Sequence, residues 1–335
     1  MIGCKDSFDI GGLQEEAKLV VNCFPANHVG EDLQSPAEDT TWIEVTRSIP
    51  VRKGSAKNLW DDFLEVTDAS IIYRVNGRQR NVGWKDRVYD KWNQPREHGR
   101  YFVTGPHHAG DRVEIEVVAS GYASVSAETV VGEPVPVRLN SIVEAKVYDP
   151  DLEESRDVYQ LSATFTDPAV TDDYYAVRVR CKHYRETAGR EDSLYSHPRI
   201  LTMSEPLLLP LSKMDSYFGF DNDFYQNFYI FTDTEINGQT YTLHLNLSPN
   251  HVLSPLDIFN LRPLRYQVQL YHITPEFYHY VKSINDVDNN GLTERGFAII
   301  EPTYSNVLGG IGVVGGYGYS ESNWETLDTN KQPND

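Results

Sequence analysis

Cysteines, methionines and long apolar runs are scarce in this chain, and each scarcity excludes a class of protein. The 335 residues include three cysteines and three methionines. So few cysteines exclude a disulfide-stapled scaffold, and none of them has the Cys-x-x-Cys spacing of a zinc or redox site. No run of about 18 or more apolar residues occurs, so the sequence predicts no membrane-spanning helix.

Basic residues are also few. Lys and Arg total 30 against 49 Asp and Glu, which gives a net charge of −19. A nucleic-acid binder needs a basic surface, so this class is excluded, and docking onto anionic lipid by charge alone is excluded as well. Tyrosine, by contrast, is abundant at 21 residues, with 13 Phe and 5 Trp. Tyrosine is typical of both strands and recognition surfaces.

The first residues resemble the end of a lipoprotein signal. Ile2-Gly3-Cys4 is typical of the box in which the cysteine is lipidated and becomes the mature N-terminus. The hydrophilic stretch from Lys5 to Gly12 that follows is typical of a tether. The sequence therefore predicts a lipid anchor at Cys4, with contact to the membrane only through that lipid. The alternative is an unmodified cysteine in a frayed terminus.

Strict alternation of apolar and polar residues is the strongest structural signal. Val113-Ile115-Val117 alternate with Glu114 and Glu116, and Val177-Val179-Cys181 alternate with Arg178 and Arg180. Such runs bury one face of an antiparallel sheet and expose the other to water. Asn-Gly pairs separate several runs, and Asn237-Gly238 predicts a hairpin. Cys23 and Cys181 fall on apolar faces of different runs and are expected to be buried and unpaired.

These patterns predict a mostly β fold with two domains. The first is an immunoglobulin-like or fibronectin-like β-sandwich, and the second is a larger antiparallel β domain with one short helix at 275–285, for which Thr274 is the N-cap and Pro275 the first helical residue. The stretch between the domains holds two prolines and predicts a stiff linker. The predicted segments are a tether at 1–16, the sandwich at 17–131, the linker at 132–137, the second domain at 138–323 and a disordered tail at 324–335.

Two loop-rich regions, 81–108 and 215–231, combine aromatic side chains with charges. Aromatic side chains in polar loops are typical of surfaces that bind a glycan or a peptide. The alternative is that they close the ends of the sandwich or pack between the domains. The candidate ligand-binding residues are Trp84, Trp92, Tyr217 and Tyr225.

One segment resembles the first half of a calcium-binding loop. Asp286, Asp288 and Asn290 offer oxygen ligands at alternate positions, and Gly291 follows at the sixth position. The twelfth position is Phe297, where a bidentate Glu is needed. Calcium binding by Asp286, Asp288 and Asn290 is therefore one hypothesis, and a plain polar turn after the helix is the other. The sequence predicts no other cofactor.

Searches for catalytic motifs find no G-x-S-x-G and no H-E-x-x-H. Gly310, Gly312 and Gly315 match the dinucleotide-binding pattern, but no helical pattern follows them, so we interpret the segment as a glycine-rich strand or bend. A pair of carboxylates for glycoside hydrolysis cannot be recognised from sequence, because its spacing is spatial. The sequence therefore predicts a protein that is not an enzyme.

Five segments in order along the chain resemble the Bacteroidota surface lipoproteins grouped as domain of unknown function four-two-four-nine. They are Gly3-Cys4 with 19–22, then 134–142, then 164–168 with Tyr174-Tyr175, then 273–280, and last 302–306 running into 309–317. The resemblance implies an outer-membrane lipoprotein exposed at the cell surface. It also implies a partnership with TonB-dependent transporters, beside which such proteins are often encoded.

The sequence and the resemblance together predict a non-catalytic binding or accessory component of a TonB-dependent nutrient uptake system. The charged pair Lys5-Asp6 after Cys4 resembles the export signal of surface lipoproteins and supports this location. Two alternatives stay open. The sandwich domain is compatible with a structural or adhesive surface protein, and the acidic and aromatic loops are compatible with an unrecognised hydrolase.

Overall fold

The structure is a computed structural model. It describes residues 16–29, 40–48, 64–89, 95–149, 153–169, 171–187, 190–202, 205–208, 228–249, 265–288 and 303–327.

Two sheets, built mostly from strands in the N-terminal part of the chain, form the first sandwich. The five-stranded sheet consists, in spatial order, of β20 (Ile311–Val314), β1 (Leu19–Cys23), β3 (Thr40–Arg47), β9 (Arg100–Thr104) and β6 (Val82–Lys85). The four-stranded sheet consists of β11 (Val125–Val130), β10 (Arg112–Val118), β4 (Ser70–Val75) and β5 (Arg78–Arg80). A small two-stranded sheet joins β7 (Val88–Tyr89) to β8 (Pro95–Glu97).

The alternation seen in the sequence explains how these two sheets face each other. In β10 the apolar residues Val113, Ile115 and Val117 are buried, whereas Glu114 and Glu116 lie on the opposite face. The three apolar residues form one core with residues of the five-stranded sheet such as Ile43 and Val103. Burial of one apolar face by each sheet therefore accounts for the sandwich.

The second sandwich also has two sheets. Its four-stranded sheet consists of β12 (Val137–Asp149), β13 (Glu154–Thr166), β18 (Thr240–Leu247) and β16 (Ile200–Leu201). Its seven-stranded sheet runs through β15 (Arg190–Ser196), β14 (Tyr174–Thr187), β19 (Arg265–Ile273), β21 (Tyr317–Glu321) and β2 (Ala26–Val29), with β17 (Tyr229–Thr232) pairing with β14 and β22 (Glu325–Thr326) pairing with β19. A second apolar core fills the space between these sheets.

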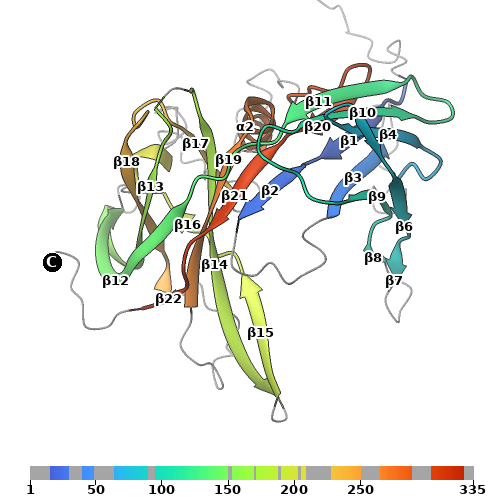
Figure 1. Cartoon of the computed structure of the whole chain (residues 1–335). Coiled ribbons are helices and arrows are strands. Elements are labelled where there is room, and N and C mark those ends of the chain that lie inside the picture. Colours follow the sequence, from blue (N-terminus) through green and yellow to red (C-terminus); the bar gives the residue numbers. More distant parts are fainter. Residues whose placement is uncertain are drawn as a thin grey trace, which may run out of the picture.

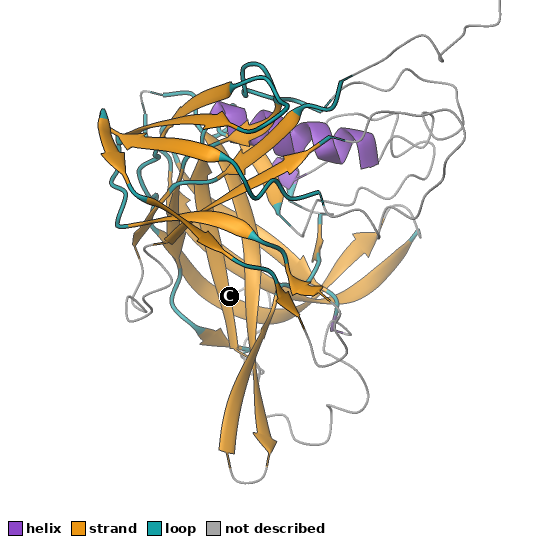
Figure 2. Cartoon of the chain, turned by 90° about the vertical axis from the view of Figure 1, so that its right-hand side faces the viewer, coloured by secondary structure: helices purple, strands orange, loops and turns teal. Residues whose placement is uncertain are grey.

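The predicted fold class is confirmed: the chain is mostly β, with antiparallel sheets and a helix. The helix α2 spans Pro275–Asp288, three residues beyond the predicted end at 285, and a 3-10 turn, η2, spans Pro206–Leu208. Figure 2 shows α2 lying across the strands at one end of the molecule. Within the described part of the chain, neither helical element has the length and apolarity that crossing a bilayer requires.

The first and last strands of the chain connect the two sandwiches. β1 pairs in parallel with β20, and after a short break β2 pairs in parallel with β21. The two pairs form a parallel ribbon that passes from one sandwich into the other, as the blue and red strands of Figure 1 show. This pairing differs from the predicted division at 132–137, because β20 joins the first sandwich and β2 joins the second. Local patterns identify strands, but they do not reveal which distant strand is the neighbour.

Three further features differ from expectation. The turn at Asn237-Gly238 does not close a hairpin, because β17 before it pairs with β14 and β18 after it pairs with β13, in opposite sheets. The segment predicted as a disordered tail at 324–335 begins with strand β22. Gln267 and Gln269 alternate with the apolar residues of β19, a pattern that predicts exposure to water, yet they are 4% and 5% exposed. Gln267 donates to the Ser322 carbonyl, and Gln269 contacts Tyr319 and Glu321, so neighbouring groups of the same sheet satisfy both amides in their buried positions.

The two cysteines within the described residues are free and buried, as predicted. Cys23 lies in the core of the first sandwich and Cys181 in the core of the second. Burial raises the pKa of the Cys181 thiol to about 12, and it raises that of Cys23 further. Both thiols therefore stay protonated at neutral pH and serve as small apolar side chains.

Candidate functional site

A cavity of about 410 Å³ lies where the two sandwiches and α2 meet. We call it the junction pocket. The first sandwich contributes strand β3 and the end of β1, and the second contributes β14, β19, β21 and the residue before β17. The lining residues are Asn22, Phe24, Trp42, Glu44, Arg178, Phe228, Tyr271, Phe277, Tyr280, Val281 and Tyr317. Its volume is in the range of pockets that bind small organic molecules.

Aromatic rings form a connected wall of the junction pocket. The Phe277 ring on α2 lies 4.5 Å from that of Phe24 and 5.5 Å, stacked, from that of Phe228. Phe228 contacts Tyr271 at 4.8 Å between centroids, and Tyr271 contacts Tyr317 at 5.7 Å. Contacts of this kind hold each ring in place, so the wall offers a preformed apolar surface to a flat ligand.

Trp42 stands on the side of the pocket that belongs to the first sandwich. The Arg100 guanidinium carbon lies 3.8 Å from its ring centroid, and the Lys85 ammonium lies 5.5 Å from it. These cation–π contacts fix the indole from strands β9 and β6. Trp42 is half-buried, so it combines a fixed orientation with access to the cavity.

The pocket carries one cationic and one anionic side chain among its described lining residues. Arg178 projects from β14 and lies 5.2 Å from the Phe228 ring, whereas Glu44 projects from β3 and is exposed. Burial raises the pKa of Tyr271 and of Tyr317, so both phenols stay neutral hydroxyl groups at physiological pH. The cavity therefore offers apolar rings, neutral hydroxyl groups and two opposite charges.

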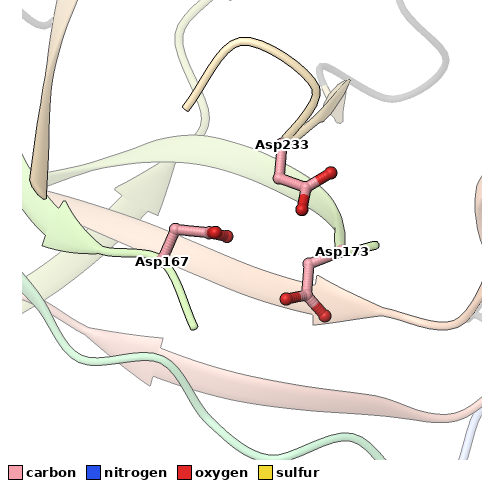
Figure 3. Close-up of side chains that lie close together, drawn as sticks. All are labelled: Asp167, Asp173 and Asp233. Atoms are coloured by element: carbon pink, nitrogen blue, oxygen red, sulfur yellow. The ribbon is translucent and has the colours of Figure 1, made fainter. Parts of the chain in front are cut away.

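A second constellation lies at the end of the second sandwich, away from this lining. Asp167, Asp173 and Asp233 are buried, and one oxygen of each lies within 4.8 Å of the others (Figure 3). They stand at the ends of β13, β14 and β17, so the turns between the two sheets bring them together. Carboxylates at this spacing are the ligands that a divalent cation prefers.

Protein donors already serve all three carboxylates. The Tyr175 hydroxyl donates to Asp167 at 2.6 Å, and the Gly238 backbone N–H donates to its other oxygen at 2.8 Å. Asp233 accepts from the Asn237 amide at 3.0 Å. These bonds tie the connections between the sheets together, which gives the cluster a structural role without an ion.

His272 joins the same cluster from β19. Its Nε2 lies 2.8 Å from an Asp173 carboxylate oxygen, and its Nδ1 lies 2.9 Å from the Glu133 carbonyl oxygen. Both ring nitrogens thus face oxygen acceptors, so both can donate when the ring is an imidazolium. The ring also stacks on Tyr175 at 5.3 Å. His272 therefore links the Asp cluster to the linker between the sandwiches.

Asp233→Asn is expected to raise the free energy of unfolding at pH 7. Burial raises the pKa of Asp233, and the charges of Asp167 and Asp173 add to the rise. A raised folded-state pKa gives stability below the unfolded-state pKa, which is lost as pH rises through the folded-state pKa, so ionised Asp233 weakens the fold at neutral pH. Urea unfolding at pH 7 and pH 4 should show a gain for Asp233→Asn that shrinks at pH 4.

Asp173→Asn is the contrasting variant in the same cluster. It removes a charged acceptor from His272 and from Thr171, whose hydroxyl donates at 2.7 Å. We expect it to destabilise the protein by about 1 to 3 kcal/mol at pH 7. A loss of stability in Asp233→Asn, or a gain in Asp173→Asn, would contradict this account of the cluster.

The structure places the sequence-predicted ligand residues as follows. Trp84 lies on β6, packs on the Tyr101 ring at 4.6 Å and donates to Asp86 at 2.6 Å. It borders the first core and is absent from the pocket lining. The other candidates, Trp92, Tyr217 and Tyr225, lie outside the described residues, and so does Cys4.

The calcium hypothesis requires a loop that starts at Asp286, and the structure differs. The helix α2 continues through Asp288, and Asp286 forms an ion pair with Lys282 one turn earlier, at 2.5 Å. Helical backbone does not curl around an ion as the calcium loop does, which requires alternate residues to converge. Asn290 lies outside the described residues.

Sequence reasoning missed most of the junction pocket. Phe277 falls within the helix predicted at 275–285, and alternation places Arg178 on the water-exposed face of a strand. Phe228 belongs to the aromatic region 215–231 that was singled out, so composition found one member of the wall. The others come from four strands (β1, β3, β19 and β21), from α2 and from the residue that follows β1. A one-dimensional pattern carries no signal for their convergence.

The dinucleotide-like motif is a strand, as interpreted from the sequence. Residues Ile311–Val314 form β20, and Gly312 adopts a φ of +113° in it. A Cβ at this position would lie 2.2 Å from the Val21 carbonyl oxygen of β1. Glycine is therefore needed for close pairing of two strands and not for a phosphate.

Comparison with known families gives one match. The family model described as "Domain of unknown function (DUF4249)" matches residues 5–323. This is the family that the five ordered segments of the sequence resemble. No curated protein matches the chain.

Proposed function

The chain belongs to the DUF4249 family, and from this premise we propose that it is a non-catalytic lipoprotein of the outer membrane that binds a small ligand in the junction pocket. In this proposal it is an accessory component of a TonB-dependent nutrient uptake system. Cys4 carries the lipid anchor and provides the only contact with the membrane. The ligand is a glycan, a peptide or a fragment of one.

The observation that carries the binding role is the junction pocket itself. Its aromatic wall joins both sandwiches and the helix, and each ring is held by contacts with the next. A cavity of this size and composition is typical of small-molecule sites, which occur preferentially where two structural units meet. Rings that are already fixed by their neighbours lose little entropy when a ligand stacks on them.

The described pocket lining supports binding over hydrolysis. Glu44 is the single carboxylate among the described residues that line the pocket. Glycoside hydrolysis ordinarily uses two carboxyl groups, one as acid and one as base or nucleophile. Within the part of the chain that the structure describes, the lining also offers no serine, cysteine or histidine from which a nucleophile and its base would be built.

Loss of the indole of Trp42 is expected to weaken ligand binding about 10- to 100-fold, because stacked aromatic side chains contribute most of the energy of such sites. The measurement is a thermal-shift screen of oligosaccharides and short peptides, followed by calorimetry on each hit with wild type and Trp42→Ala. Tyr148→Ala, which removes a 59% exposed ring far along β12, is the matched control and should bind as wild type does. Hits that bind wild type and Trp42→Ala equally well would show that these ligands do not bind in the junction pocket.

The location is tested separately in cells. The full-length protein with Cys4→Ser is expected to leave the membrane fraction, whereas wild type should incorporate a labelled fatty acid and stay there. Wild type should also co-purify from native membranes with a TonB-dependent transporter. Recovery without any transporter would contradict the accessory role and leave an adhesive surface protein as the better account.

A further inference from the structure

The junction pocket has opposite charges on the parts of its lining that come from different sandwiches. Arg178 comes from β14 of the second sandwich, and Glu44 comes from β3 of the first. We propose that the pocket selects a small organic anion, such as a peptide fragment whose carboxylate is joined to a flat apolar side chain, and that Arg178 binds the anionic group. This inference rests on the proposed ligand-binding function and names the class of ligand for the same site.

Arg178 is suited to receive a planar anion. Its guanidinium lies 5.2 Å from the Phe228 ring and hydrogen-bonds the Tyr271 hydroxyl, so contacts with the pocket wall orient it. A guanidinium carries five N–H donors in a fixed planar fork, and this geometry allows a carboxylate to bind through two parallel hydrogen bonds. Its fork matches a carboxylate better than an ammonium group does.

The neighbouring hydroxyl groups add to this selectivity. Burial raises the pKa of Tyr271 and Tyr317, and both stay protonated at neutral pH. A neutral phenol can donate a hydrogen bond to an anion, whereas an ionised one would repel it. The end of the pocket around Arg178 thus supplies donors, and the rings beside it supply the surface for an apolar body.

Glu44 sets the orientation of the ligand. An anion near this carboxylate would be repelled, so the anionic group is directed to the Arg178 wall. The protein as a whole has a net charge of −19. Against such a background an anionic ligand gains no general attraction, and its binding depends on the local cation.

The experiment uses two probes of nearly equal shape, indole-3-acetate and its neutral amide, indole-3-acetamide. Their dissociation constants are measured by ligand-observed NMR and calorimetry with the purified protein. Wild type is expected to bind the acid about tenfold more tightly than the amide, because a charge-assisted bidentate contact exceeds a neutral one. Arg178→Gln should abolish this preference by weakening the acid and leaving the amide unchanged.

Three further variants separate charge recognition from the pocket itself. Glu44→Gln should strengthen acid binding about two- to fivefold without affecting the amide, since it removes a repulsion. Trp42→Ala should weaken both probes alike, because it removes stacking surface. Arg138→Gln removes one positive charge, as Arg178→Gln does, but on the exposed face of β12, so it should leave both dissociation constants as in wild type.

The outcomes distinguish this inference from the proposed function. Equal affinity for acid and amide in wild type, or an acid preference that survives Arg178→Gln, overturns anion selection and leaves the binding role standing. Failure of both probes to bind at millimolar concentration counts against the junction pocket as a binding site and so against the proposed function. Circular dichroism of each variant confirms that a loss of binding is not a loss of fold.

Discussion

Gly318→Ala is expected to lower the free energy of unfolding by more than about 3 kcal/mol, a large share of the stability of a typical domain. A Cβ on Gly318 would lie 2.4 Å from the Glu133 carbonyl carbon and 2.5 Å from the Pro134 nitrogen. Both are backbone atoms, so no side chain can rotate out of the way. The linker would have to move off the ribbon of β21.

The linker cannot move off easily, because it is held on both sides of this contact. The Glu133 carbonyl accepts a hydrogen bond from His272, and the Ser320 hydroxyl donates to the Val135 carbonyl. Gly132 faces the same crossing, where a Cβ would lie 2.8 Å from the Gly318 nitrogen. The two glycines let the linker and the ribbon approach within backbone contact. One added methyl group would therefore push the linker and the ribbon apart.

Gly110→Ala is the matched control for Gly318→Ala. Gly110 has a φ of +82°, and a Cβ on it would meet no atom within 4 Å. Its substitution should therefore cost only the left-handed backbone strain, about 1 to 2 kcal/mol. Urea unfolding of the two variants measures the difference. A Gly318→Ala variant no less stable than Gly110→Ala would show that the linker and the ribbon are not in firm contact.

The strands could be predicted from the sequence because their information is local. In β10 and β14 every second residue is apolar, and the structure buries those residues on one face. The helix was equally local, since Pro275 and the apolar spacing after it mark its start. The pairing of β1 with β20 joins residues nearly 300 positions apart, and no local period encodes it. The one local feature related to this pairing is the glycine-rich segment around Gly312, where β1 approaches β20 closely.

The junction pocket shows the same limit at the level of function. Alternation placed Arg178 on the polar face of β14, and that face is indeed the one opposite the core. The sequence could not show that α2 and the first sandwich cover this face and turn it into a cavity wall. Aromatic content singled out the region of Phe228, but Trp42 and Tyr271 lie in strands whose patterns resemble ordinary sheet. A binding site formed by tertiary packing is visible only after the packing is known.

Glu205→Ala is expected to destabilise the protein by about 3 to 5 kcal/mol, because three hydrogen-bond donors lose their acceptor and each unsatisfied buried group costs about 1 to 3 kcal/mol. Glu205 is fully buried, with 0% exposure. One carboxylate oxygen accepts from the Tyr241 hydroxyl at 2.8 Å and the Leu207 N–H at 3.2 Å, and the other accepts from the His244 N–H at 2.7 Å. Alanine would leave three donors unsatisfied in the interior.

The position of Glu205 explains why its loss should unfold more than one turn. It immediately precedes η2, and its bonds to Tyr241 and His244 fasten that turn to β18, a central strand of the four-stranded sheet. Glu205→Gln keeps one acceptor oxygen but turns an amide N–H₂ toward a donor, so its cost should be intermediate. Glu235→Ala removes an exposed acid and should shift stability by less than about 0.5 kcal/mol. Thermal unfolding that ranks the three variants in any other order would contradict the assignment of this carboxylate as the buried acceptor that fixes η2 to the sheet.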